Sequence, residues 1–164
     1  MAFTVSSNSF KDGDYLKMTH VVSADTGFGC AGDNLSPHLA WSGAPAGTKS
    51  FTVTCFDPDA PTGSGFWHWL VVNIPPDVTE LALGAGSKGG ALPNGALQTR
   101  TDYGFAGYGG PCPPEGDHPH RYLFTVHAVN DTLGVKEDTP AAQIGFNLHF
   151  KTLAKASIMG LYKR

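Results

Sequence analysis

The chain has 164 residues, a formal net charge of -3 at pH 7 and a hydrophobic fraction of 41%. This length fits one domain, residues 1–164, with enough apolar material to form a core without disulfides or a structural metal. The small negative charge gives no basic surface, so nucleic acid is excluded as the expected partner. Charged residues make up only 15%, whereas there are 21 glycines and 12 prolines. This composition is typical of short strands joined by tight turns.

The sequence shows neither a secretory signal nor a membrane-spanning segment. The N-terminal stretch MAFTVSSNSFKDGDYL has no basic region followed by an apolar one. The longest apolar run, WHWLVVNIP, is too short and too polar to cross a bilayer. Cys30, Cys55 and Cys112 are an odd number of cysteines without CxxC spacing. We therefore expect reduced thiols in a cytoplasmic protein, with a disulfide as the less favoured alternative.

The first half of the chain predicts a hairpin or meander and then two strands. Asp12-Gly13 is a turn signal for the opening hairpin. In KSFTVTCFD, residues 49–57, one face carries three apolar side chains and ends on Asp57. The segment FWHWLVVNIP, residues 66–75, is nearly apolar throughout and predicts a central strand.

The second half predicts another strand and a helix. Residues 76–111 are rich in Gly, Pro and small side chains, which favours an ordered excursion of short turns. The segment HRYLFTVHAV, residues 120–129, predicts a third strand. Thr139-Pro140 is a helix-start signal. Three apolar side chains at helical spacing then predict a core-facing stripe of Phe146, Phe150 and Leu153. The final SIMGLY predicts a return to strand, so we expect a β-rich core with one C-terminal helix.

Two of these strands carry polar side chains with two competing interpretations each. Asp57 begins the DPDAP turn, which closes at Pro61, and is either part of an ordinary acidic turn or a pocket-lining carboxylate. His68 stands between Trp67 and Trp69, and alternation places it opposite both; it is either a core histidine or a pocket residue. If the three strands are neighbours, Asp57 and His68 converge with the same-face pair His120 and Tyr122.

The stretch GGPCPPEGDHPHRYLFTVHAV, residues 109–129, suggests a metal site, a thiol nucleophile or a rigid wall. Cys112, His118 and His120 lack a fourth zinc ligand, and a 2-His-1-carboxylate iron site lacks an evident second shell. Prolines on both sides of Cys112 disfavour a helix that would activate its thiol. We expect no metal and no cofactor. The stiff loop instead favours a wall, with the Cys112 amide free to meet a ligand oxygen.

Three blocks carry a resemblance that covers essentially the whole chain. NLSPHLAW, DPDAPTGSGFWHWLVVNIP and GYGGPCPPEGDHPHRYLFTVHAV resemble the signature blocks of the phosphatidylethanolamine-binding proteins, most closely the bacterial Raf-kinase-inhibitor-like branch. The resemblance implies a mainly β fold, with two antiparallel sheets packed as a sandwich, a C-terminal helix and short helical turns. It also implies a small anion pocket, whose residues in this sequence are Asp57, Pro61, His68, Cys112, Pro113, His120 and Tyr122. His118 has no fixed counterpart in the motif.

The functional hypothesis is a pocket for a small anionic or zwitterionic ligand, such as phosphate or a phospholipid head group. In it the two imidazoles, the Tyr122 hydroxyl and the Cys112 amide donate hydrogen bonds, and Asp57 either accepts from a histidine or meets an ammonium group. One alternative is a small-molecule hydrolase with Asp57 and His120 as acid and base. A second is a protein-interaction module that docks a kinase or protease. A homodimer is suggested by related bacterial proteins.

Overall fold

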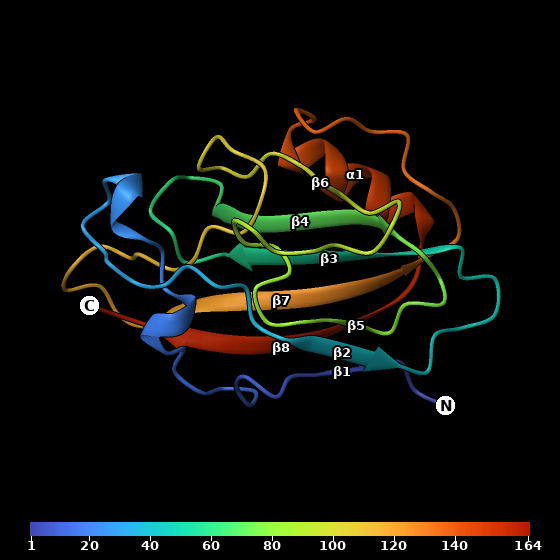
Figure 1. Ribbon diagram of the computed structural model, residues 1–164, viewed down its shortest axis with the longest axis horizontal. Coiled ribbons are helices and arrows are strands. Elements are labelled where there is room, and N and C mark those ends of the chain that lie inside the picture. The colour runs from blue at the N-terminus through green and yellow to red at the C-terminus, as the bar shows by residue number, and fades with distance from the viewer.

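The computed structural model describes residues 1–164 and has a five-stranded antiparallel sheet at its centre (Figure 1). Its strand order is β6-β4-β3-β7-β8. The strands are β3 (Ser50–Asp57), β4 (Phe66–Ile74), β6 (Leu97–Gln98), β7 (His120–Val129) and β8 (Thr152–Tyr162). The three strands predicted over residues 49–57, 66–75 and 120–129 are thus β3, β4 and β7, and β3 lies between the other two. Their apolar faces make them the core of the sheet.

A smaller antiparallel sheet packs against one face of the larger one. It contains β1 (Thr4–Ser6), β2 (Leu39–Ser42) and β5 (Glu80–Leu81), in the order β1-β2-β5. The predicted opening hairpin or meander is wrong, because β1 pairs with β2 more than thirty residues later and not across the Asp12-Gly13 turn. The Asp12-Gly13 turn instead contacts β8: the Gly13 amide donates to the Met159 carbonyl, and the Asp12 carboxylate accepts from the Met159 amide.

The main core fills the space between the two sheets. It joins inward-facing residues of β3, β4 and β7, such as Val53, Val71 and Phe124, to Leu39 of β2 and Leu81 of β5. Apolar area removed from water is the dominant favourable term in folding, so this layer stabilises the sandwich. The expected arrangement of two packed antiparallel sheets with one C-terminal helix is confirmed.

Helix α1 (Ala141–Lys151) covers the outer face of the large sheet (Figure 1). Its buried residues are Ala141, Ile144 and Leu148, which pack on β4 and β7. The predicted stripe is wrong: Phe146 and Phe150 are each 67% exposed, and Leu153 belongs to β8 and is 44% exposed. At about 100° per residue, positions 146 and 150 lie roughly opposite 144 and 148.

The connections are short turns with little regular structure of their own. Two 3-10 turns span Met18–His20 and Ala24–Thr26, ahead of β2. The excursion over residues 76–111 is ordered, as expected, and contributes β5 and β6. None of the helices is long and apolar enough to cross a membrane.

Candidate functional site

A cavity of about 190 Å³ opens where β3 ends and where β4 and β7 begin. Because β3 runs antiparallel to both β4 and β7, the end of β3 lies beside the beginnings of β4 and β7, at the same end of the sheet. Thirteen residues line the cavity, and all seven site residues expected from the sequence are among them: Asp57, Pro61, His68, Cys112, Pro113, His120 and Tyr122. Other hollows of the molecule are larger, but none gathers so many buried ionisable side chains. Chemistry rather than size therefore singles out this cavity.

A bulge in β4 turns His68 into the cavity. Cys55 of β3 pairs with Trp69 and the next residue, Phe56, pairs with Trp67, which leaves His68 without a partner on β3. Such an extra residue breaks strict alternation and re-aims a side chain. Trp69 packs in the core between the sheets, whereas Trp67 packs on the outer face. The expectation that His68 faces opposite both tryptophans is wrong, because its ring shares the inner side with Trp69.

The His68 imidazole is buried, with 4% of its surface exposed, and has one fixed hydrogen bond. Its Nδ1 lies 2.7 Å from the carbonyl oxygen of Gly109, so Nδ1 carries a proton and donates. Burial lowers the pKa of His68, and the Gly109 carbonyl and the charge of Asp57 only partly oppose this effect. The neutral ring thus has a lone pair on Nε2, which has no partner within the protein.

His120 is held between two carboxylates. Its Nδ1 donates to Asp57 across 2.7 Å, and its Nε2 donates to Asp117 across 2.9 Å. Burial by itself lowers the pKa of His120, but the hydrogen bonds that the ring donates to Asp57 and Asp117, with the charges of these carboxylates, outweigh burial and leave the pKa raised. His120 is accordingly an imidazolium with both N–H groups occupied. The hypothesis that His120 donates to a ligand oxygen would require Asp117 to move away.

Asp117 was missed by the sequence analysis. It occupies the third position before His120, in the stretch EGDHPH, and its side chain is 38% exposed. The signal was present as an acidic residue close to the histidine, but the sequence does not show that the connecting turn folds back onto the ring.

Two hydrogen-bond donors of the cavity have no protein partner. The Tyr122 hydroxyl accepts and donates no hydrogen bond within the chain, although the residue is only 1% exposed. Burial, together with the charge of Asp57, raises the pKa of Tyr122, so the hydroxyl keeps its proton. The Cys112 amide is likewise absent from the backbone hydrogen bonds, as expected for an N–H between prolines.

Aromatic side chains form the remaining wall. The rings of Phe66 and Tyr103 both pack against His68, and Phe28 packs edge-on against Tyr103. The Tyr103 hydroxyl donates to the Gly110 carbonyl across 2.7 Å and so faces the wall, not the ligand space. Gly110 lies so close to the His20 carbonyl that any Cβ would overlap it. The wall is therefore close-packed on its outer side.

The architecture and these residues match a known family over nearly the whole chain. The family model described as "Phosphatidylethanolamine-binding protein" matches residues 6–163. This chain belongs to that family. It is 55% identical to the UPF0098 protein YbhB of Escherichia coli K12 over 157 residues, which cover 95% of this chain and 97% of that protein.

Solved relatives share the fold of this chain. Its structure is similar to that of E. coli YbcL, which is described as a new member of the mammalian PEBP family, with a TM-score of 0.95, 51% identity, and coverage of 100% of this chain and 99% of that chain. A PEBP homologue from Chlamydia trachomatis, CT736, has a TM-score of 0.81 and 30% identity, with coverage of 99% and 98%.

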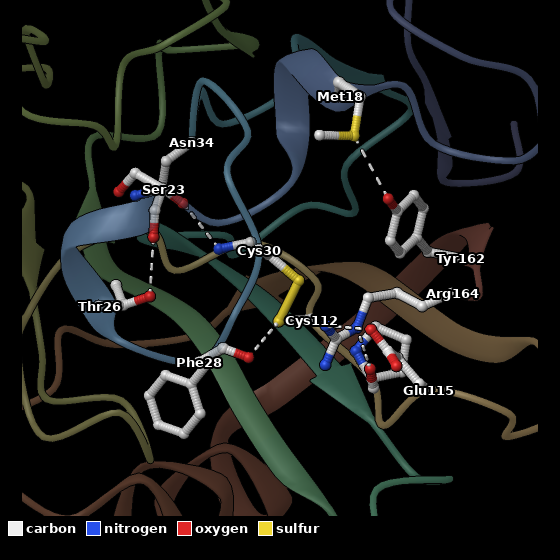
Figure 2. The surroundings of a disulfide bond; sticks show 12 residues. Met18, Ser23, Thr26, Phe28, Cys30, Asn34, Cys112, Glu115, Tyr162 and Arg164 are labelled. Atoms are coloured by element: carbon white, nitrogen blue, oxygen red, sulfur yellow. Dashed lines mark hydrogen bonds and ion pairs between the residues drawn. A yellow bond between two sulfur atoms is a disulfide. The ribbon is translucent and has the colours of Figure 1, made fainter.

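In this family member a disulfide ties two segments of the cavity wall together (Figure 2). Cys30 and Cys112 are bonded, and Cys112 Sγ lies beside the carbonyl oxygen of Phe28. The expectation of three reduced thiols is therefore wrong for two of them, and only Cys55 is a free, buried thiol. The sequence did not indicate this pair, because the number of cysteines is odd and these two are 82 residues apart. Only the fold brings them together.

The histidines around the cavity do not gather around a common metal position. No group of three His, Cys, Asp or Glu side chains is arranged to hold a metal ion. The two nitrogens of His120 point to carboxylates on opposite sides of the ring, while His118 turns its Nδ1 toward the carbonyl of Pro119. The polar side chains around the cavity are thus arranged for hydrogen bonding.

Proposed function

We propose that the chain binds a small anionic or zwitterionic ligand, of the phosphate or phosphoethanolamine type, in the cavity at the ends of β3, β4 and β7. The observation that carries this proposal is the pair of unpartnered donors, the Tyr122 hydroxyl and the Cys112 amide, in a cavity that also holds an imidazolium. Donors that open onto a cavity without a partner in the protein favour a ligand that supplies hydrogen-bond acceptors.

The other polar groups fit the rest of such a ligand. Asp57 accepts from His120 Nδ1, and the His120 ring lines the cavity, so its positive charge would favour an anionic ligand there. Asp57 is also an acceptor for an ammonium group. A cavity of about 190 Å³ is smaller than the pockets of drug-sized ligands and holds a head group, so acyl chains would extend past the rim, where Phe28 is 54% exposed.

Calorimetric titration with phosphate and with phosphoethanolamine tests the proposal. We expect both to bind to the wild type and Tyr122→Phe to weaken both by roughly tenfold, the value of one lost hydrogen bond to a charged group. Tyr15→Phe is the matched control, because Tyr15 is 55% exposed and does not line the cavity. No heat of binding with either ligand between pH 5 and 8 would contradict the proposal.

A hydrolase is the second candidate, and the 2.7 Å contact between Asp57 and His120 favours it. Such a pair suits acid-base work on a small phosphorylated or glycosidic substrate. Turnover of an aryl phosphate that is lost in both Asp57→Asn and His120→Ala would support catalysis. Tight ligand binding without any turnover would leave binding as the function.

A kinase or protease partner and a homodimer are further proposals for this chain. The pair Trp67 and Trp69 offers little to such a contact, because Trp69 is fully buried. Phe146 and Phe150 are the large apolar side chains most available to it. Light scattering on the eluting protein measures the oligomeric state. Inhibition of a purified kinase or protease that survives Tyr122→Phe would indicate an interaction independent of the cavity.

The cytoplasmic location expected from the sequence stays a prediction. The Cys30–Cys112 disulfide argues against it, because disulfides persist mainly in oxidising compartments. Fractionation of cells that produce the natural gene product tests the location.

A further inference from the structure

A second hollow lies on the outer face of the large sheet and shares no lining residue with the cavity. It is a groove of about 520 Å³ between α1 and the outward-facing side chains of β3, β7 and β8. This volume falls within the roughly 300–1,000 Å³ typical of small-molecule sites. Leu123, Thr125 and His127 alternate along β7 and line its floor, and four residues of strand span roughly 13 Å. The groove is therefore long enough for an extended small molecule.

The two ends of the groove differ in chemistry. One end has the apolar side chains of Phe56, Trp67 and Leu123, and the ring centroids of Phe56 and Trp67 are 4.6 Å apart. At the other end Lys155 of β8 pairs directly with His127 of β7. An aromatic wall that leads to a basic end is suited to a ligand with an apolar body and an anionic head.

Lys155 has the one permanent charge among the residues that line the groove, because no aspartate, glutamate or arginine lines it. The nearby Lys151 pairs with Asp131 across 3.3 Å, whereas Lys155 is exposed and forms no ion pair. Burial, with the charge of Lys155, lowers the pKa of His127 to about 4, so this ring is neutral at pH 7. A single positive charge without a counter-ion in the protein favours a monoanion.

The floor of the groove contains a hydroxyl group without a protein partner. Thr54 of β3 is only 3% exposed, lines the groove and forms no side-chain hydrogen bond within the chain. Its oxygen is not among the fully enclosed unpartnered atoms, so the surface that remains accessible opens onto the groove. Thr125, the cross-strand neighbour of Thr54, has its own hydroxyl 2.7 Å from that of Ser157. The Thr54 hydroxyl is therefore available to a ligand oxygen.

Gly145 leaves space beside the aromatic end of the groove. It lies inside α1, where glycine is unfavourable relative to alanine because it loses more conformational freedom on folding. Its backbone does not have the positive φ that favours glycine, and a Cβ would lie 3.6 Å from the Trp67 ring, an ordinary contact distance. Neither the backbone nor a steric clash thus requires glycine here. A larger side chain would instead occupy the space next to Trp67.

We infer that this groove is a second binding site, for a small monocarboxylate with an apolar body. The carboxylate accepts from the Thr54 hydroxyl and pairs with Lys155, whose flexible stem allows the ammonium group to reach inward from β8. The apolar body packs against Phe56 and Trp67, in the space beside Gly145. This site goes beyond the proposed function and does not depend on it.

Octanoate and octylammonium are matched probes, because they have similar chains and opposite charges at pH 7. We expect calorimetry to show that octanoate binds to the wild type and that octylammonium binds at least roughly tenfold more weakly, the value of one charge-assisted hydrogen bond. Equal affinity for the two probes overturns the inference, and so does an absence of octanoate binding.

Two variants test the two ends of the groove separately. Gly145→Leu fills the space next to Trp67, and Lys155→Met removes the charge while keeping a stem of similar length. We expect each to weaken octanoate binding by roughly tenfold. Lys163→Met is the matched control, since Lys163 is exposed and does not line the groove, and it should leave the affinity unchanged. If Lys155→Met binds octanoate as tightly as Lys163→Met does, the inference is wrong.

The position of the bound probe separates this site from the cavity. We expect octanoate to change the NMR chemical shifts of Thr54 and His127, and Tyr122→Phe to leave its affinity unchanged. Loss of octanoate binding in Tyr122→Phe would place the probe in the cavity and overturn this inference alone. Failure of phosphate and phosphoethanolamine to bind, with octanoate binding retained, would overturn the proposed function alone.

A second copy of the chain is the competing occupant of the groove. Light scattering on the wild type and on Gly145→Leu measures whether the groove holds two molecules together. We expect the same oligomeric state for both proteins, with or without octanoate. A wild-type dimer that Gly145→Leu dissociates would show that the partner molecule fills the groove, and would overturn the inference.

Discussion

The carboxylate of Asp57 and the imidazole of His120 form a buried pair, with 2.7 Å between Oδ2 and Nδ1 and only 1% and 3% of the His120 and Asp57 side chains exposed. The second oxygen of Asp57 accepts from the Asp59 amide. Asp57→Asn leaves one acceptor oxygen for these two donors, so one hydrogen bond is lost. We expect a lower pKa of His120, measured by NMR titration, and a loss of roughly 1 to 3 kcal/mol in the free energy of unfolding.

Asp59→Asn is the control for the Asp57 variant, because it removes the same charge two residues away. The Asp59 carboxylate contacts Arg121, which holds the pKa of Asp59 down to about 2, and it does not contact His120. If both substitutions lower the pKa of His120 equally, the overall negative charge of the acidic turn sets this pKa, and the hydrogen bond between Asp57 and His120 does not.

The disulfide predicts a large dependence of stability on redox state. Cys30 and Cys112 close a loop of 82 residues, and a cross-link of that length restricts the unfolded chain by about 4 to 5 kcal/mol in the entropic treatment. We therefore expect Cys30→Ser with Cys112→Ser to lower the free energy of unfolding by up to this amount in urea titrations. Reductant should destabilise the wild type and leave the double variant unchanged.

Thiol counting provides a separate check on the disulfide. We expect the unfolded, unreduced protein to present one reactive thiol, that of Cys55. Three thiols under these conditions would contradict the bond.

The half-buried His127 predicts loss of stability in mild acid. Burial, with the nearby Lys155, lowers the pKa of His127 to about 4 from the usual 6.5. Because the folded pKa lies below the unfolded one, this contribution is complete above pH 6.5 and is lost as the pH falls from 6.5 toward 4. We expect His127→Gln to reduce the loss of stability between pH 7 and 5 by about 2 kcal/mol in urea titrations. His20 and His68, whose pKa values are also lowered, act in the same direction.

The control for this prediction is His149→Gln, since His149 is an exposed side chain on the same side of the sheet. The interpretation fails if His127→Gln and His149→Gln reduce the pH dependence of the free energy of unfolding equally. It also fails if the His127→Gln profile matches that of the wild type.

Truncation of a side chain on the buried face of α1 should lower the free energy of unfolding much more than truncation on its exposed face. Ile144 is fully buried beneath the helix, and Ile144→Ala should lower the free energy of unfolding by about 2 to 5 kcal/mol. Phe150→Ala removes a larger side chain that is 67% exposed and should change it by about 0.5 kcal/mol or less. Chemical unfolding of both variants measures the difference, and a large loss in Phe150→Ala would indicate that a second molecule covers this face in solution.

The sheet and the membership of the cavity could be predicted from the sequence, because alternation and the signature blocks are local patterns. The order of β4, β3 and β7 then brings Asp57, His68, His120 and Tyr122 together. The direction of the hydrogen bonds could not be predicted. That His120 donates to two carboxylates, and that His68 donates to the Gly109 carbonyl, depends on backbone groups and turns that only the fold brings close.

The errors have equally specific causes. The disulfide joins cysteines from two loops with no short spacing between them. The helix stripe was assigned from Phe146 and Phe150, although the smaller pair Ile144 and Leu148 is the one that reaches the sheet. Both pairs have the i, i+4 spacing of a helix, so spacing alone did not distinguish the two faces, and packing on the sheet decides which one is buried.

The bulge at position 68 has a consequence for which mutations can remove the imidazole from the cavity. His68 is an extra residue between two matched pairs, so loss of one codon there would join Trp67 to Trp69 in an unbroken ladder and leave the cavity without its imidazole. A point substitution would keep the bulge and change only the chemistry of the side chain. The side chain at this position and the backbone geometry that presents it can therefore be changed by different mutations, a base substitution for the first and a three-base deletion for the second.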